Sequence, residues 1–94
     1  MNGERYIGRL TVPVDDLPAD MEYIDDAVHR YMRFNGGRKL SCRFDRGRRL
    51  WTYEFKSISA AQDSIWETGN HITLIGVGKG CLLGDVFPAI PRGE

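Results

Sequence analysis

The stretch RFDRGRRLWTYEF at residues 43–55 decides the fold, because it reads as two strands around a tight turn. Its second half alternates large rings with other side chains, which is the period of a strand that buries one face. The rings on that face are Trp51, Tyr53 and Phe55. Burying such rings stabilises a fold far more than solvated charge pairs do. We therefore expect the rings to face a core and the neighbouring arginines to face solvent.

The other half of the hairpin follows the same alternation over residues 39–44, where Leu40, Cys42 and Phe44 share one face. Between the two strands stand Asp45, Arg46 and Gly47. This composition predicts a three-residue loop in which the glycine takes the left-handed conformation.

Upstream of the hairpin, the sequence predicts a strand and then a helix. Residues 6–14 (YIGRLTVPV) alternate with period two, which predicts a strand that faces a core. The segment DDLPAD at residues 15–20 offers carboxylates for a helix N-cap and a proline that the first turn tolerates. A stripe at steps of three and four then predicts a helix, with these members: Met21, Ile24, Val28, Tyr31 and Met32. Gly36 and Gly37 should end it.

Downstream, Ser59 and Gln62 form a capping-box pair at the start of a short second helix. Its inward residues are Ile58, Ala61 and Ile65, Trp66 stands near its end, and Gly69 and Asn70 end it. Residues 71–77 (HITLIGV) are uniformly apolar enough to predict the fourth strand. Residues 78–94 keep several large apolar side chains among glycines and prolines, so we expect an apolar C-terminal extension that packs on the domain.

The predicted order is β-α-β-β-α-β. This order predicts an α+β, ferredoxin-like two-layer sandwich, with a four-stranded antiparallel sheet and two helices on one face. A length of 94 residues fits a single domain, residues 1–94, with one core.

The formal net charge is zero, but the charges are segregated along the chain. Residues 1–37 carry seven acids against four bases, and residues 38–56 carry seven bases against two acids. No apolar run has the length of a membrane helix, and no basic segment leads into an apolar one at the N-terminus. We therefore expect a cytoplasmic protein without membrane contact. Cys42 and Cys81 lack the spacing of a zinc site or a disulfide framework, so we expect reduced thiols.

Two short strings give the chain a resemblance to the RNA-recognition motif. RYIGRL at residues 5–10 resembles the first-strand signature of that family, and WTYEF followed by SISAAQDSI at residues 51–65 resembles its third strand and second helix. The resemblance implies single-stranded nucleic-acid binding on the open face of the sheet. The residues that it implies for this role are Tyr6, Arg9, Arg43 and Thr52.

The sequence departs from that family where bases would stack. If Tyr53 and Phe55 are in the core, the stacking positions fall on Leu50 and Thr52, and Tyr6 is the remaining ring. The alternation through residues 6–14 turns Tyr6 inward as well. Since each stacked base contributes about 1–3 kcal/mol, this favours a shared topology over a shared function.

Motifs of enzymes are incomplete in this sequence. GVGKG at residues 76–80 follows an apolar stretch, but a phosphate-binding loop requires glycine where Thr73 stands and a hydroxyl residue where Gly80 stands. His29 and His71 have no sequence partners that would define a catalytic triad or a metal site. We therefore expect no enzymatic activity, no cofactor and no bound metal.

The leading hypothesis is a small non-catalytic protein that binds a partner protein and occupies its surface. It is similar in size and in its separated charges to phage-encoded inhibitors of host machinery, such as anti-CRISPR proteins. The expected partner is a host protein or a protein–nucleic-acid complex, recognised by complementary charge and a few anchoring side chains. On the hairpin, the candidates are Arg46, Arg48, Arg49 and Leu50. On the expected solvent side of the first helix, they are Glu22, Asp25 and Asp26. The alternative is the RNA-recognition-like module, and the sequence leaves the oligomeric state open.

Overall fold

The computed structural model describes residues 4–13, 21–74 and 83–89. Along the chain its elements are β1 (Tyr6–Pro13), α1 (Met21–Phe34), β2 (Arg38–Asp45), β3 (Arg48–Phe55), α2 (Ile58–Leu74) and β4 (Leu83–Pro88). The predicted helix start at residues 15–20 lies outside the described residues. In the described ranges, neither helix combines the length and the apolar character needed to cross a bilayer.

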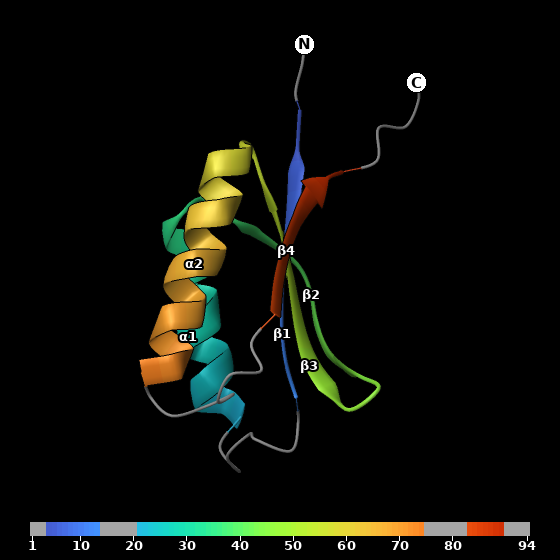
Figure 1. The fold of residues 1–94 in the computed structure, drawn as a ribbon, viewed down its shortest axis with the longest axis vertical. Helices are drawn as coiled ribbons and strands as arrows, with labels where there is room; N and C mark the ends of the chain where they lie inside the picture. The colour runs from blue at the N-terminus through green and yellow to red at the C-terminus, as the bar shows by residue number, and fades with distance from the viewer. Residues whose placement is uncertain (1–3, 14–20, 75–82, 90–94) are drawn as a thin grey trace.

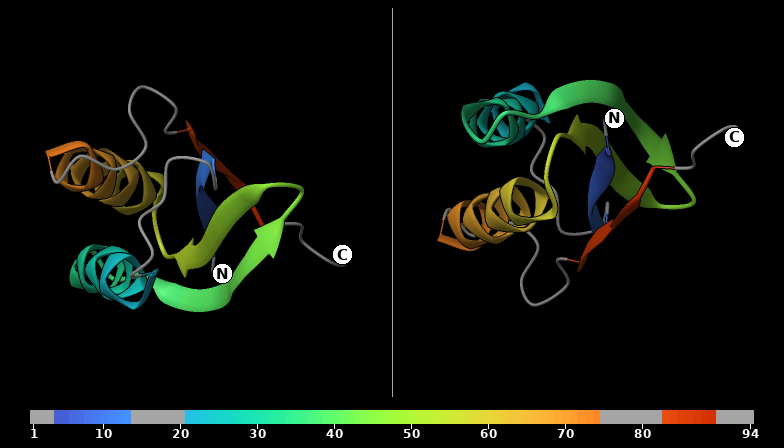
Figure 2. Two further views of the ribbon diagram at one scale, coloured as in Figure 1. Left: turned by 90° about the horizontal axis from the view of Figure 1, so that it is seen from below. Right: turned by 90° about the horizontal axis from the view of Figure 1, so that it is seen from above.

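The four strands form one antiparallel sheet in the order β2-β3-β1-β4. Both helices cover the same face, and the sheet twists so that the β2–β3 hairpin extends away from them (Figures 1 and 2). This is the predicted α+β, ferredoxin-like sandwich. The face of the sheet that is turned away from the helices is called the open face below.

The core lies between the sheet and the helices, and the hairpin rings form its centre as predicted. Trp51 and Tyr53 expose none of their surface and Phe55 exposes 1%. They pack with buried side chains of the central strand β1 and of both helices: Leu10, Val12, Ile24, Val28, Met32, Ala61 and Ile72. The large apolar area of these rings therefore fixes which face of β3 points inward.

Helix α1 follows its predicted stripe and ends where the glycines predict. Gly36 has a φ of 87°, and its N–H donates to the carbonyl of Arg33, while the Gly37 N–H donates to the carbonyl of Met32. These two bonds form a Schellman motif, which satisfies the last carbonyls of a helix and reverses the chain toward the next strand.

The second helix and the fourth strand differ from the sequence-based prediction. Helix α2 continues through Gly69 and Asn70 to Leu74, so residues 71–74 are helical and the prediction of a strand over residues 71–77 is wrong. Residues 75–77 of that prediction lie outside the described residues. The buried face of α2 includes two polar residues, Ser64 and Thr68, which are both fully buried. A pattern of apolar residues alone therefore does not show the helical period of this segment.

The fourth strand comes from the segment predicted as a C-terminal extension. β4 pairs with β1 from Thr11↔Leu83 to Tyr6↔Pro88. Its proline stands at its end on an edge strand, where a missing N–H is tolerated. A Cβ on Gly84 would collide with the side chain of Ile65, so this glycine lets α2 pack closely over β4.

The hairpin turn is shorter than predicted. Asp45 pairs with Arg48, which leaves a two-residue loop of Arg46 and Gly47 with φ values of 52° and 78°. Positive φ at both central residues is the feature of a type I′ turn, whose twist matches that of the flanking strands.

Candidate functional site

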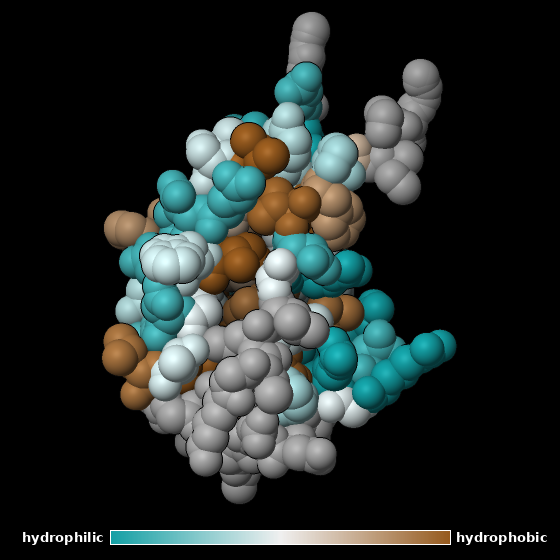
Figure 3. All heavy atoms as spheres, in the orientation of Figure 1, coloured by the Kyte–Doolittle hydropathy of each residue, from teal (hydrophilic) through white to brown (hydrophobic). Residues whose placement is uncertain are grey.

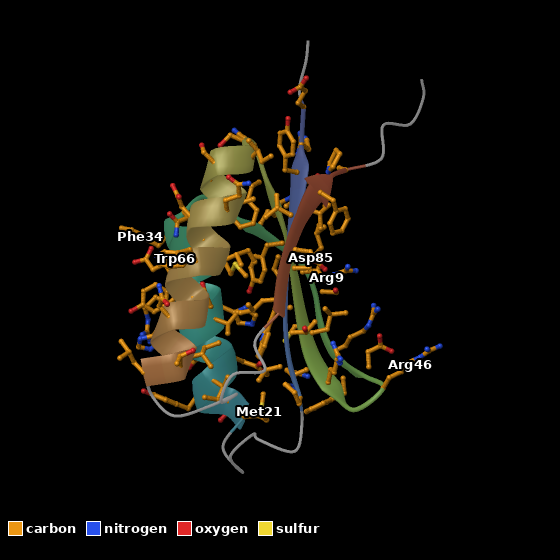
Figure 4. The ribbon with its side chains drawn as sticks, in the orientation of Figure 1. Arg9, Met21, Phe34, Arg46, Trp66 and Asp85 are labelled. Carbon is orange, nitrogen blue, oxygen red and sulfur yellow. The ribbon has the colours of Figure 1, made fainter. Side chains whose placement is uncertain are left out.

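The hairpin presents three arginines that are exposed and have no hydrogen bond or ion pair among the described residues. We call Arg43, Arg46 and Arg48 the hairpin arginines. Strand parity places Arg43 and Arg48 on the open face, and Arg46 projects from the turn into solvent (Figure 4). Guanidinium groups without internal partners can bind carboxylates or phosphates through two parallel hydrogen bonds.

Arg46 occupies a backbone conformation that arginine disfavours. Its φ of 52° lies in the left-handed region, which asparagine and glycine adopt at lower cost in the first position of a type I′ turn. A non-glycine residue in this region costs on the order of 1 kcal/mol. The turn therefore carries a charged side chain at its tip at the expense of some local stability.

Arg49 is not part of this free set, although the sequence grouped it there. Its Nε donates to Oδ1 of Asp25 at 3.2 Å and its NH2 group donates to Oδ2 at 2.5 Å. The side chains of Arg49 and Asp25 expose only 12% and 21%. The Arg49 guanidinium also lies 4.5 Å from the ring centre of Phe44. Its bonds are internal, so we remove Arg49 from the predicted binding residues.

Asp25 is likewise half-buried and not on the solvent side of α1, which corrects the prediction. Besides Arg49, its Oδ1 accepts a hydrogen bond of 2.8 Å from the indole N–H of Trp51 and lies 3.6 Å from the Cys42 sulfur. Burial acts to raise the pKa of the Asp25 carboxyl, but the bonds from Arg49 and Trp51 outweigh it and lower this pKa below its ordinary value. This polar cluster of Asp25, Cys42, Arg49 and Trp51 joins the hairpin to α1.

The remaining predicted residues divide between exposed and buried positions. Leu50 exposes only 7% of its surface, so its side chain cannot anchor a partner without rearrangement. Glu22 and Asp26 are exposed on α1 as predicted. The acidic strip of the sequence thus retains these two carboxylates among the described residues, because Asp25 is bonded internally.

The nucleic-acid alternative loses Tyr6, the ring that it assigned to the open face. Tyr6 packs against the core on the helix side of the sheet, so it does not lie on the open face as that alternative requires. Thr52 lies on the open face opposite Arg9 on β1. Arg9 itself donates to Asp85 at 2.9 Å and lies 5.1 Å above the ring of Phe87.

Other arginines at the open face also have internal partners. Arg5 and Arg38 both bond to Oε1 of Glu54, at 3.1 and 2.6 Å. These bonds and the charges of the two arginines lower the pKa of Glu54, with the Arg38 hydrogen bond as the largest cause. A shallow hollow of about 310 Å³ lies on this face between the hairpin and β4. It is lined by Arg9, Thr11, Asp45, Arg48, Leu50, Gly84 and Asp85.

Sequence reasoning missed several exposed apolar side chains. Phe44, predicted on the inward face with Cys42, is 55% exposed, and the Arg49 guanidinium lies against its ring. On the outer surface of the helices, Phe34, Trp66 and Leu74 expose 78%, 73% and 84%. The sequence could have indicated the exposure of Trp66 and Leu74 if the full length of α2 had been predicted. In a helix that continues to Leu74, these two residues lie outside the buried stripe of Ala61, Ser64, Thr68 and Ile72.

The buried polar atoms between the layers give no catalytic or metal geometry. His29 Nδ1, the Tyr53 hydroxyl and the Thr68 hydroxyl are buried without a hydrogen-bond partner in the described part of the chain. Burial is the main cause that lowers the pKa of His29, and the charge of Lys39 contributes. Within residues 4–13, 21–74 and 83–89, no group of histidine, cysteine and acidic side chains could hold a metal ion. Cys42 is a free thiol, and Cys81 lies outside these ranges.

No family model matches the sequence, and no curated protein matches it. Solved structures do share its fold. A Nitrosomonas europaea protein whose name proposes an antibiotic biosynthesis monooxygenase is 11% identical, with a TM-score of 0.61 over 99% of this chain and 98% of its own.

Two further structures are similar. The de novo designed protein Foldit4 is 7% identical, with a TM-score of 0.60 over 97% of this chain and 100% of its own. Protein SO0527 from Shewanella oneidensis is 13% identical, with a TM-score of 0.58 over 94% and 93%. Since one of these folds is a design and all the identities are low, the likeness extends to the ferredoxin-like fold and not to an activity.

Proposed function

We propose that this protein is a non-catalytic binding protein that contacts an acidic surface of a partner protein through its β2–β3 hairpin. The observation that carries the proposal is the turn itself: Arg46 holds a positive φ and projects beyond the domain, with Arg43 and Arg48 beside it and none of the three bonded within the described residues. Phe44 adds a half-exposed ring on the other face of the same strand pair. Arginine and aromatic side chains are the residues that most often dominate the affinity of protein interfaces.

The rigidity of the hairpin supports this role. The bidentate bond between Arg49 and Asp25 and the Trp51 indole bond to the same carboxylate hold the half of the hairpin next to the turn against α1. A held hairpin loses less conformational entropy on binding than a free loop, so more of the contact energy contributes to affinity.

A protein partner fits the charges better than a single nucleic-acid strand. The net charge is zero, and Arg5, Arg9 and Arg38 are paired with carboxylates at the open face. A nucleic-acid platform would use free cations there together with stacked rings. Three arginines at one tip instead suit a compact acidic patch. Inhibition of host machinery, in the manner of anti-CRISPR proteins, is the role that we propose for this contact, and it rests on the size and the separated charges alone.

The test is a pull-down from the host extract with a photo-reactive residue at the hairpin. Benzoylphenylalanine in place of Phe44 should cross-link one protein as a 1:1 adduct. The same residue in place of Ile58 should not; Ile58, predicted to face inward, is 48% exposed at the start of α2. The double variant R46E/R48E should abolish the complex by like-charge repulsion. The matched control R30E reverses an exposed arginine on the outer side of α1 and should retain it.

A labelled pool of single-stranded RNA and DNA, measured across a salt series, separates the alternative. Affinity that falls steeply with salt and depends on Arg43, Arg46 and Arg48 would identify phosphate recognition instead. Retention of the protein complex by R46E/R48E would remove the hairpin from the interface.

A further inference from the structure

The outer side of the helical layer carries a shallow groove that the proposed function does not use. Its volume is about 580 Å³, and it runs between α1 and α2. Its lining residues are Tyr31, Asn35, Asp63, Trp66, Glu67, Asn70, His71 and Leu74. The labelled side chains of Phe34, on α1, and Trp66, on α2, both lie at the outer edge of the helices in Figure 4, on the side away from the hairpin. Figure 3 shows apolar residues at that outer edge as well as along the junction between α2 and the sheet.

The floor of the groove is ordered by contacts between the two helices. The Tyr31 hydroxyl lies 3.3 Å from Nδ1 of His71, and the two ring centres are 4.7 Å apart. The Asn35 amide donates to Oε1 of Glu67 at 3.3 Å and to the Tyr31 carbonyl at 3.1 Å. These bonds fix the spacing of the helices, so the groove is already formed without a ligand.

The charges of the groove are unbalanced. Asp63 and Glu67 both line it, and no arginine or lysine lines it. In the described part of the chain, neither carboxylate forms an ion pair, and the hydrogen bond that Glu67 accepts comes from the neutral amide of Asn35. Beside them stands the indole of Trp66, which is 73% exposed. An indole face attracts cations, and the attraction adds to that of nearby carboxylates.

We propose that this groove binds a basic segment of a partner protein, with an arginine side chain placed over Trp66 and paired with Asp63 and Glu67. Guanidinium is the cation that fits best, because it is planar, stacks on aromatic rings and binds carboxylates with two hydrogen bonds. The exposed aromatic ring of Phe34 and the exposed aliphatic side chain of Leu74 would cover the apolar parts of the segment.

This site is independent of the hairpin. The helices cover one face of the sheet (Figures 1 and 2), while strand parity places Arg43 and Arg48 on the other face and Arg46 projects from the turn (Figure 4). The groove has the opposite charge, so the two surfaces select different partners. A protein with both surfaces could join an acidic partner to a basic one.

The test follows the indole N–H signal of Trp66 by nuclear magnetic resonance, with Trp66→Phe to assign it against the buried Trp51. The probe is the acetylated and amidated peptide Gly-Ser-Arg-Ala-Arg-Ser-Gly, and its control is the same peptide with citrulline at both arginines. We expect a saturable shift of the Trp66 signal with the arginine peptide and a much smaller one with citrulline.

The double variant D63N/E67Q should weaken binding about fivefold or more, since two exposed ion pairs are lost. Asp26→Asn, an exposed acid outside the groove, should leave binding unchanged.

Three results would overturn the proposal. Equal binding of the citrulline peptide would show that charge is not recognised. Unchanged binding by D63N/E67Q, with the variant folded by circular dichroism, would place the peptide elsewhere. A Trp66 signal that shifts with protein concentration in the absence of peptide would show that a second copy of the chain occupies the groove. The variant R46E/R48E should bind the arginine peptide normally, so failure at the hairpin and failure at the groove are distinguishable.

Discussion

Replacing Asp25 by alanine should destabilise the protein far more than its position on a helix surface would indicate. Asp25 accepts hydrogen bonds from Arg49 and from the indole of Trp51. Removing it leaves a guanidinium that is only 12% exposed without a counter-charge, with the Cys42 sulfur as its remaining acceptor, and leaves the N–H of a fully buried tryptophan without an acceptor.

The magnitude follows from these two losses. Breaking a buried ion pair by removing one partner costs about 3–5 kcal/mol, and an unsatisfied buried donor costs about 1–3 kcal/mol. The two costs overlap, and water reaches the 21% of Asp25 that is exposed. We therefore expect Asp25→Ala to lower the free energy of unfolding by about 2–4 kcal/mol. Asp26→Ala, one residue along the helix and exposed, should change it by no more than about 0.5 kcal/mol.

Urea unfolding at pH 7 measures both values. With a slope of about 1–3 kcal/mol per molar urea, a loss of about 3 kcal/mol shifts the midpoint by about 1–3 M. Adding Arg49→Met to Asp25→Ala removes the stranded charge, so the double variant should be more stable than the sum of the singles by about 1–2 kcal/mol. Equal midpoints for the Asp25 and Asp26 variants, or strict additivity in the double variant, would refute the role of this cluster.

Three further variants probe other features. Arg46→Asn should raise the free energy of unfolding by about 0.5–1 kcal/mol, because asparagine suits the φ of 52°, while weakening the proposed complex; a variant that gains no stability and keeps the complex would contradict both arguments. The pKa of His29 is lower in the folded state, so its contribution to stability is complete above the unfolded pKa near 6.5 and is lost as pH falls through the folded pKa. Thermal melts from pH 7.5 to 5 should show a falling melting temperature. In His29→Gln the melting temperature should depend less on pH over the same range. Gly37→Ala should cost about 2–3 kcal/mol in urea unfolding, because its Cβ would lie 2.7 Å from the Phe55 ring and 2.8 Å from a backbone carbonyl; Gly36→Ala, which meets nothing within 4 Å, should cost only the backbone strain of about 1 kcal/mol.

The hairpin and the first helix could be predicted because their physics is local. Alternation of Trp51, Tyr53 and Phe55 against smaller side chains sets a two-residue period, and the Gly36–Gly37 pair ends α1 wherever that helix packs. The second helix and fourth strand could not, because tertiary packing overrides local preference there. Gly69 lies inside α2 although glycine disfavours helices by about 1 kcal/mol, and β4 forms from a segment with glycine and proline because β1 offers it a free edge.

Part of the candidate site followed from the sequence for the same reason. Exposure of Arg46 and Arg48 follows from the turn and from strand parity. The pairing of Arg49 with Asp25 does not, because it joins residues 24 positions apart whose contact depends on how α1 crosses the sheet. Counting charges along the chain therefore placed Arg49 on a hairpin surface and Asp25 on a helix surface, although the two residues bond to each other.

The pairing of Tyr6 with Pro88 has a practical consequence for engineering. The first and last strands are neighbours and run in opposite directions, so the chain enters and leaves the sheet at the same corner, remote from the Arg46–Gly47 turn (Figure 1). A short linker across that corner would allow a circular permutant with new ends at the turn. Such a permutant would keep every strand pair while cutting the tip in two, and affinity tags at the original ends would leave the tip unobstructed.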